Sequence, residues 1–163
     1  AAASTHASRL VRRYGRPVDD PGGGLTHTFP VIETLVDIDP HSMALPRARR
    51  SALTTLVAAL ANGQLVLDPG CDWQQAREQL SVLPGIGPWT VELVAMRGLG
   101  DPDAFPVSDL GVRTAANRIG LPGSDAELIR RSGPWRPWRS YATQHLWTTL
   151  DHPVNTWPKQ EIA

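Results

Sequence analysis

Apolar residues recur at intervals of three and four along most of this sequence, which is the spacing of one face of an α-helix. In the stretch PRARRSALTTLVAALANG, Leu53, Leu56, Val57 and Leu60 share one face, and Gly63 follows the end of the pattern. No segment alternates apolar and polar residues as a half-buried strand does. We therefore expect an all-α fold. The helices are predicted at residues 1–14, 30–37, 39–44, 46–62, 71–82, 88–100, 108–119, 124–132 and 137–150.

The segments between these patterns are rich in Gly and Pro, and the longest is the loop GRPVDDPGGGLTHTF. Ser124 and Glu127 have the spacing of a capping box at the start of the helix predicted at 124–132. The chain is long enough for one domain with a core. We expect a single helical domain over residues 1–150 and a loose tail over residues 151–163.

Composition narrows the class of protein. The 16 basic and 16 acidic side chains balance, which counts against an indiscriminate nucleic-acid binder but allows a protein that grips a few phosphates through backbone amides. The single cysteine, Cys71, excludes an internal disulfide and an iron–sulfur cluster held by this chain alone, and it suits the cytoplasm. No apolar run is long enough to span a bilayer, and the start does not read as a signal peptide. The chain opens without Met in what reads as mid-helix, so we expect a piece of a longer protein.

The stretch LPGIGPWT joins two predicted helices through a short turn. Gly85 and Gly87 allow backbone angles closed to other residues and let another molecule approach the main chain. Pro88 suits the first turn of the next helix, whose free amides and partial positive charge form a site for an anion such as phosphate. A plain helix–helix turn explains a G-x-G element alone at least as well.

The full string resembles the helix–hairpin–helix motif of DNA-binding proteins, in which a hydrophobic residue, Pro, Gly, a hydrophobic residue and Gly follow in this order. The resemblance implies that the amides of Gly85 and Gly87 and the side chain of Thr90 hold DNA phosphates. Such contacts position the duplex without reading its sequence. It also implies that backbone carbonyls in the turn can share a sodium or potassium ion with one phosphate. The corresponding carbonyls are those of Ser81, Leu83 and Ile86.

Downstream, FPVSDLGVRTAANR sets Asp109 at the start of a predicted helix. Taken by itself, Asp109 or Ser108 is best interpreted as an N-cap, worth about 1 kcal/mol. A catalytic role is compatible with capping, because a helix N-terminus favours an ionised carboxylate.

Three separated motifs occur in an order that resembles the helix–hairpin–helix DNA glycosylase superfamily. They are the hairpin at 83–90, a loop at 101–110 that contains Pro106 and leads into V-S-D-L-G-V-R, and a late RPWRSYATQHLW. Within it, the late run is most similar to the bacterial 3-methyladenine DNA glycosylase II group. The resemblance extends over residues 1–150. It implies that Asp109 is the catalytic aspartate, which stabilises positive charge on the deoxyribose as the N-glycosidic bond breaks.

The same resemblance implies excision of alkylated purines, of the 3-methyladenine and 7-methylguanine type, from double-stranded DNA after the base is flipped out. Trp89 and Trp147 match pocket tryptophans, on which a cationic purine stacks with cation–π attraction of about 0.5–2 kcal/mol. Leu93 stands where a tyrosine is found in the best-known relatives. Relatives that nick the strand carry a lysine at the position of Trp89, so we expect an abasic site without nicking. No cofactor is implied, and the histidines lack metal-ligand spacing.

Three further expectations concern the rest of the chain. Trp73, Trp135, Trp138 and Trp157 are interpreted as core residues. Arg136 and Arg139, with Tyr141, are expected to hold the last helix and are candidates for DNA contact as well. Surface arginines are more often only solvated, which is also the expectation for Arg47, Arg49 and Arg50. The family's wedge for the flipped-base gap, its N-terminal β-rich domain and, in some relatives, a methyl-accepting regulatory module would precede residue 1.

Two other classes of function remain open at this point. A non-catalytic helix–hairpin–helix module predicts phosphate contacts but no need for Asp109 or the pocket tryptophans. A helical protein–protein module predicts no DNA binding. The spacing of Asp109 and the late tryptophan motif favour the enzyme, for which we expect the bacterial cytoplasm, in association with the nucleoid.

Overall fold

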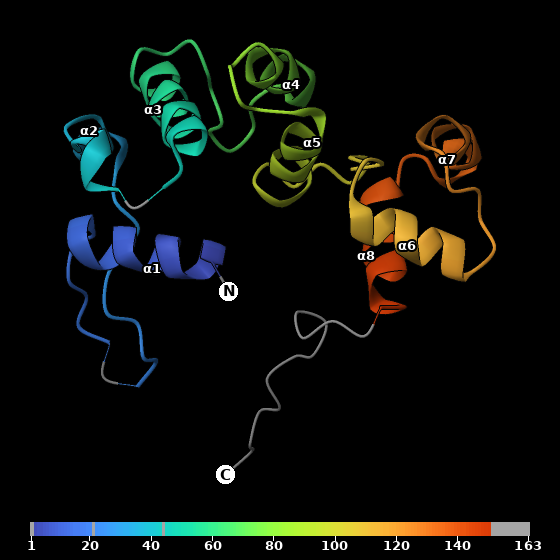
Figure 1. The fold of residues 1–163 in the computed structure, drawn as a ribbon, viewed down its shortest axis with the longest axis horizontal. Coiled ribbons are helices and arrows are strands. Elements are labelled where there is room, and N and C mark those ends of the chain that lie inside the picture. Colours follow the sequence, from blue (N-terminus) through green and yellow to red (C-terminus); the bar gives the residue numbers. More distant parts are fainter. Residues whose placement is uncertain (1, 21, 44, 151–163) are drawn as a thin grey trace. The chain divides into compact units, whose positions relative to one another are not determined.

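A computed structural model describes residues 2–20, 22–43 and 45–150 (Figure 1). Within these ranges every regular element is a helix, apart from an isolated β-bridge between Pro17 and His27, so the predicted all-α fold is confirmed. The helices are α1 (Ala2–Tyr14), α2 (Ile32–Val36), η1 (Pro40–Ser42), α3 (Arg47–Ala61), α4 (Trp73–Ser81), α5 (Pro88–Arg97), α6 (Leu110–Arg118), α7 (Asp125–Arg131), η2 (Gly133–Trp135) and α8 (Arg139–Thr148), where η denotes a 3-10 turn.

The predicted helices all occur, with ends that differ by a few residues. α5 begins at Pro88, as the sequence predicts, because the fixed φ of proline suits the first helical position. The 3-10 turn η2 is not predicted by the pattern. The predicted tail at 151–163 lies outside the described residues. No helix in the described ranges has the length and apolar character needed to cross a lipid bilayer.

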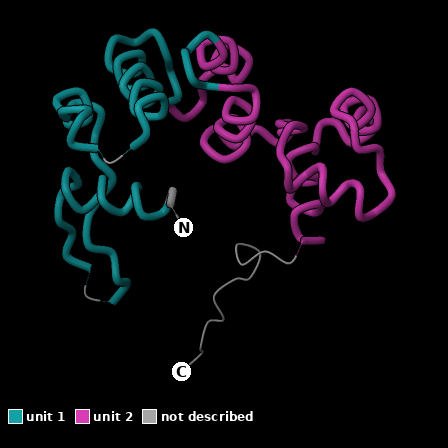
Figure 2. The backbone as a smooth tube through the Cα atoms, in the orientation of Figure 1, with its two compact units in different colours: residues 1–67, 82–86 teal, residues 68–81, 87–163 magenta. Residues whose placement is uncertain are grey.

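The chain divides into two compact units (Figure 2). The first contains residues up to 67 together with 82–86, and the second contains residues 68–81 and those from 87 onward. The turn of the hairpin therefore belongs to the first unit, while α4 and α5, the helices it connects, belong to the second.

In the first unit, the segment predicted as a long loop doubles back on itself. The N–H of Val18 donates to the carbonyl of Thr26, and the N–H of Thr28 donates to the carbonyl of Arg16. The hydroxyls of Tyr14 and Ser42 lie 2.8 Å apart and tie the end of α1 to η1.

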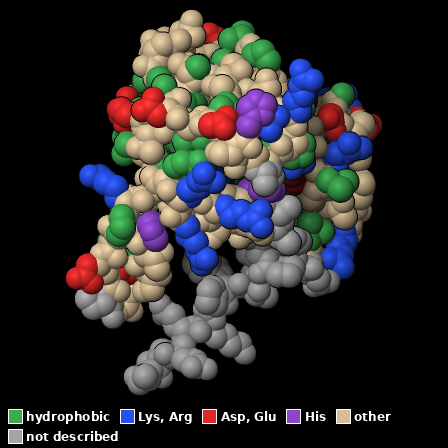
Figure 3. All heavy atoms as spheres, turned by 60° about the vertical axis from the view of Figure 1, so that its left-hand side comes forward, with side chains coloured by type: hydrophobic (Ala, Val, Ile, Leu, Met, Phe, Trp, Pro, Cys, Tyr) green, Lys and Arg blue, Asp and Glu red, His purple; other side chains and the backbone are tan. Residues whose placement is uncertain are grey.

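Three arginines of α1, at positions 9, 12 and 13, are exposed. Basic side chains (blue) are prominent on the face drawn in Figure 3, alongside acidic ones (red). α1 thus presents positive charge to solvent, although the whole chain has no net charge.

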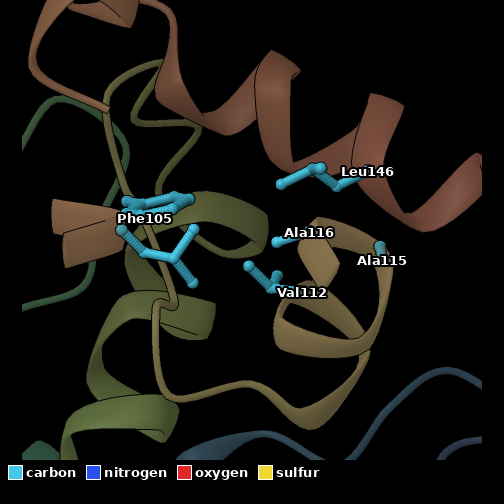
Figure 4. Close-up of a cluster of buried hydrophobic side chains, with 6 residues drawn as sticks. Phe105, Val112, Ala115, Ala116 and Leu146 are labelled. Carbon is cyan, nitrogen blue, oxygen red and sulfur yellow. The ribbon is translucent and has the colours of Figure 1, made fainter. Parts of the chain in front are cut away.

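The core of the second unit lies between α6, α8 and the segment that leads into α6 (Figure 4). Figure 4 shows Leu146 of α8 facing Val112 and Ala116 of α6, with Phe105 beside them. The small residues of α6 let α8 approach closely, and Trp135 packs edge-on against Phe105 at 6.0 Å between ring centroids. This packing anchors both ends of the segment that carries Asp109.

Candidate active site

Asp109 is the N-cap of α6, as the sequence predicts. Its Oδ1 accepts a hydrogen bond of 2.9 Å from the N–H of Val112, which is one of the first-turn amides that lack a partner within the helix. The carboxylate therefore stands at the positive end of the helix dipole.

Two tryptophans from other helices bind the same carboxylate. Trp89, in the first turn of α5, donates its indole N–H to Oδ2 of Asp109 over 2.7 Å. Trp147, near the end of α8, donates its indole N–H to Oδ1 over 3.0 Å. Hydrogen bonds to an ionised acceptor are roughly twice as strong as neutral ones, so three fixed N–H donors hold this carboxylate in one orientation.

The surroundings of Trp147 include the third predicted pocket residue. Leu93 and Trp147 both pack against the buried cluster of Ala95, Met96 and Ala104. The guanidinium of Arg97 lies 5.3 Å from the centroid of the Trp147 ring, within cation–π range. The structure thus gathers Asp109, both predicted pocket tryptophans and Leu93 in the second unit.

Residues 101–105, which we call the strap, run from the end of α5 toward Asp109 and are held by ionic contacts. Arg77 of α4 pairs with Glu92 of α5, with 2.8 Å between Nε and Oε1, and also with Asp101 of the strap. Burial by itself lowers the pKa of Arg77, but the hydrogen bonds to Glu92 and Asp101, together with the negative charges of these residues, outweigh burial and raise that pKa above the ordinary value. A raised pKa means that the pairing favours the charged guanidinium.

The other ionic contact of the strap is made from α8 and the turn before it. Arg139 donates to both carboxylate oxygens of Asp103, over 2.7 and 2.8 Å, and Arg136 donates to one of them over 2.8 Å. The hydrogen bonds from Arg139, which outweigh burial, and those from Arg136 lower the pKa of Asp103 below its ordinary value. The expectation that these arginines hold the last helix is confirmed, and the partner that does so is an aspartate of the strap.

The hairpin has the backbone that its sequence predicts. Gly85 has a φ of +86°, a left-handed conformation that favours glycine, and a Cβ there would lie 2.6 Å from Cβ of Ala52. Gly87 is the N-cap of α5 and makes no capping bond through a side chain, and Pro88 follows in the first turn. The Leu83 carbonyl accepts the N–H of Ile86 over 3.1 Å.

Some predicted roles at the hairpin stay predictions. These are the phosphate contacts of Gly85, Gly87 and Thr90, and the sodium or potassium site at the carbonyls of Ser81, Leu83 and Ile86. Gly85 lies in the first unit, whereas Gly87 and Thr90 lie in the second.

This chain is similar to known proteins in both sequence and fold. No family model matches the chain. It is 66% identical over 160 residues to the probable bifunctional transcriptional activator/DNA repair enzyme AlkA of Mycobacterium tuberculosis. It is 33% identical over 153 residues to DNA-3-methyladenine glycosylase 2 of Escherichia coli. These matches cover 98% and 91% of this chain. The chain spans 32% of the first relative and 52% of the second.

Solved structures agree on the fold. The 3-methyladenine DNA glycosylase of Archaeoglobus fulgidus superposes with a TM-score of 0.71 at 24% identity, over 90% of this chain and 51% of that one. The 3-methyladenine DNA glycosylase of Schizosaccharomyces pombe in complex with abasic DNA superposes with a TM-score of 0.69 at 21% identity, over 96% of this chain and 76% of that one. This chain is a member of the helix–hairpin–helix DNA glycosylase superfamily.

Membership in this superfamily confirms the resemblance seen in the sequence. Two expectations about buried tryptophans, however, were wrong. Trp73 and Trp138 are not core residues, because 39% and 57% of their surfaces are exposed. Trp135 does pack on the core, and Trp157 lies outside the described residues. Helical periodicity places Trp73 on the apolar face of α4. Trp73 is, however, the first residue of this helix, so no preceding helical turn lies beside its side chain to cover it.

The ionic contacts of the strap were missed by the sequence analysis. Their signal is the acidic pair in DPDAF, read together with the arginines in RPWR. The resemblance indicates a role for Arg136 and Arg139, but it does not identify Asp103 as the acceptor of their hydrogen bonds.

Proposed function

We propose that the protein is a DNA glycosylase that hydrolyses the N-glycosidic bond of alkylated purines and leaves an abasic site. The observation that carries the proposal is that Asp109, at the start of α6, accepts an indole N–H from both Trp89 and Trp147. A carboxylate and two aromatic rings in contact are what this reaction needs. The relatives named DNA-3-methyladenine glycosylase in Escherichia coli and Bacillus subtilis support the same substrate class.

Asp109 acts on the sugar in this proposal. Breaking the bond between base and deoxyribose develops positive charge at the sugar, as in other glycoside hydrolysis. An ionised carboxylate aimed at that charge stabilises it, and fixed donors keep the carboxylate in place without reorganisation during the reaction. Asp109 can also orient the water that attacks C1′.

The tryptophans act on the base. A purine alkylated at N3 or N7 is cationic and electron-poor, so it stacks on an indole ring with an attraction of about 0.5–2 kcal/mol. The base reaches such a ring only after it has been flipped out of the duplex. Because the cationic purine is a good leaving group, no general acid is needed beside Asp109.

Cleavage of the strand itself is not part of the proposal. A glycosylase that nicks DNA through a Schiff base needs an amine to attack the sugar. The position where such relatives carry a lysine is occupied by Trp89, and the sequence contains a single lysine, Lys159. We infer that the product is an intact strand with an abasic site.

DNA binding is assigned to the hairpin and supported by charge. The first-turn amides of α5 follow Gly87, and the helix dipole makes that end favourable for a phosphate. The exposed arginines of α1 add positive charge in the first unit. Such contacts are sequence-independent, which suits an enzyme that must search DNA for rare lesions.

The test is base release by the full-length protein from duplex DNA that carries 3-methyladenine or 7-methylguanine. Wild-type protein should release the free base and leave sites that break only in alkali. Asp109→Asn should lose about 100-fold or more of this rate, because it removes the charge but keeps a capping side chain. The matched control is Asp72→Asn, since the carboxylate of Asp72 also receives first-turn amides, those of Gln74 and Gln75 of α4, and is not part of the site.

The outcomes separate the three classes of function. DNA binding without base release by any protein would favour a non-catalytic DNA-binding module. Neither binding nor release would favour a helical protein–protein module. Equal rates for wild type and Asp109→Asn would remove Asp109 from the mechanism.

A further inference from the structure

Glu92 lies on α5 and uses its two carboxylate oxygens for different partners. Oε1 accepts a hydrogen bond of 2.8 Å from Nε of Arg77, and Oε2 accepts one of 2.8 Å from the N–H of Phe105. The first partner is a side chain of α4, and the second is the last backbone amide of the strap. Glu92 therefore joins α4, α5 and the strap.

Arg77 extends this connection to the other end of the strap, where it pairs with the buried carboxylate of Asp101. The exposed fractions of the three side chains are 19% for Arg77, 27% for Glu92 and 6% for Asp101. The group is thus better shielded from water than an ordinary surface ion pair, which contributes little. The strap is fixed at its first and last residues by one network.

The path from Phe105 to Asp109 is short and stiff. The N–H of Val107 donates to the carbonyl of Phe105 over 2.7 Å, and the N–H of Asp109 donates to the carbonyl of Pro106 over 2.9 Å. Pro106 is fully buried, and its ring fixes its φ. A displacement of Phe105 is therefore passed on to Asp109 rather than absorbed between them.

α5 thus reaches Asp109 in two ways. Trp89, one turn before Glu92 on the same helix, holds the Asp109 carboxylate, and Glu92 holds the backbone that leads to it. We propose that Glu92 is a positioning residue that sets the placement of Asp109 against Trp89 by acting through the strap. Its effect on catalysis rests on the glycosylase function proposed above, whereas its effect on the geometry of Asp109 does not.

Two variants of Glu92 in the full-length protein test this role by single-turnover base release and DNA affinity. Glu92→Ala leaves the Phe105 N–H without an acceptor, and it should lower the rate of base release about 10- to 100-fold, the loss expected when a reacting group shifts by about 1 Å. Glu92→Gln keeps a carbonyl oxygen for that N–H and should recover most of the rate. The dissociation constant for DNA should stay within about twofold in both, since the lost interaction acts after binding.

The matched control is Glu78→Gln on α4. Glu78 is exposed and accepts a hydrogen bond of 2.9 Å from the side chain of Gln74, outside the network. Its rate of base release should equal that of wild type. A fall of the same size in the control would show that the loss is not specific to Glu92.

A second measurement does not depend on activity. The indole N–H resonances of Trp89 and Trp147 are read in 1H–15N NMR spectra and assigned with Trp89→Phe and Trp147→Phe. Because the Trp89 N–H is hydrogen-bonded to Asp109, its resonance should shift in Glu92→Ala, shift less in Glu92→Gln and stay in place in Glu78→Gln. If Glu92→Ala does not fold, Glu92→Gln decides alone.

The two readouts distinguish failure of this inference from failure of the proposed function. An unshifted Trp89 resonance in the folded Glu92 variants overturns the positioning role, whatever the rates. A shifted resonance together with weaker DNA binding and an unchanged single-turnover rate also overturns it. A shifted resonance in a protein whose wild type releases no base supports the positioning of Asp109 and refutes the glycosylase.

Discussion

The indole N–H of Trp89 donates to Oδ2 of Asp109 over 2.7 Å, from a ring that is 42% exposed. The other carboxylate oxygen receives Trp147 and the helix amide of Val112, so each oxygen has at least one fixed donor. A carboxylate held this way does not have to reorganise when positive charge develops beside it. In the proposed mechanism the tryptophans therefore have two separable roles, a ring face for the base and an N–H for the aspartate.

Trp89→Phe separates these functions, because it keeps an aromatic ring and removes the N–H. Hydrogen bonds to charged groups contribute about 1.5–3 kcal/mol, and partial exposure of Trp89 favours the lower end, so we expect the rate of base release to fall about tenfold. DNA affinity should change little. Single-turnover base release and a binding isotherm measure the two effects.

The control for Trp89→Phe is Trp138→Phe, which alters an exposed tryptophan that does not contact Asp109. It should leave the rate unchanged. A wild-type rate in Trp89→Phe would mean that this indole hydrogen bond contributes nothing to the reaction.

Much of this site follows from local sequence. The turn in LPGIGPWT follows from the freedom of Gly85 and the fixed φ of Pro88, and the cap at Asp109 follows from its place before an apolar helical pattern. These are local preferences, which act within one turn of helix. The hydrogen bond between Trp89 and Asp109 joins residues 20 positions apart, so local preferences do not predict it. Only the family resemblance places both residues in one site.

The ion pairs show where local reasoning ends. Arg77 and Asp101 lie 24 positions apart, and many other pairs of opposite charge in this chain are equally close in sequence. Which of them meet depends on how α4, α5 and the strap pack. Exposure of Trp73 and Trp138 has the same origin, because periodicity shows a face but not whether another element covers it.

Gly85→Ala should destabilise the protein. The φ of +86° is unfavourable for a residue with a Cβ, by about 1–2 kcal/mol, and the new methyl group would lie 2.6 Å from Cβ of Ala52 in α3. We expect the free energy of unfolding to fall by at least about 1–2 kcal/mol, measured by urea denaturation. Weaker DNA binding should accompany this loss if the turn contacts phosphate.

Gly133→Ala is the matched control for the hairpin glycine. No atom lies within 4 Å of a Cβ built at Gly133, and its φ is not positive. Its free energy of unfolding should stay within about 0.5 kcal/mol of wild type. Equal stability of the two alanine variants would contradict the strained conformation of Gly85.

The pairing of Asp103 with Arg139 predicts a pH dependence of stability. The folded-state pKa of Asp103 is lowered below 3.8, its ordinary value, so the pair stabilises the protein above that pH. This stabilisation is lost as the pH falls from about 3.8 through the folded-state pKa. Asp103→Asn should therefore be less stable than wild type at pH 7, and the difference should narrow as the pH drops below 3.8.

Urea denaturation of both proteins over a pH series measures this effect. Arg139→Gln serves as the second variant, because it removes the main partner of Asp103. The difference in unfolding free energy between wild type and Arg139→Gln should narrow over the same pH range. A constant difference between wild type and Asp103→Asn down to acid pH would show that this ion pair does not contribute to stability.

Ser140→Ala tests how firmly the strap is held from α8. The buried hydroxyl oxygen of Ser140 lies 2.6 Å from the carbonyl oxygen of Asp101 and 3.0 Å from that of Ala104, so its single O–H can serve two carbonyls of the strap. Its removal leaves these buried acceptors short of a donor, which costs about 1–3 kcal/mol in the free energy of unfolding. Ser132→Ala is the matched control, because Ser132 is also a buried serine, and its hydroxyl donates to the carbonyl of Ile129, three residues earlier and outside the strap. Urea denaturation should show a larger loss of unfolding free energy for Ser140→Ala than for Ser132→Ala.

Base release should also fall in Ser140→Ala, because a loosened strap lets Asp109 move against Trp89, whereas Ser132→Ala should keep the wild-type rate. Equal losses of stability and rate in the two variants would mean that the strap is held without Ser140.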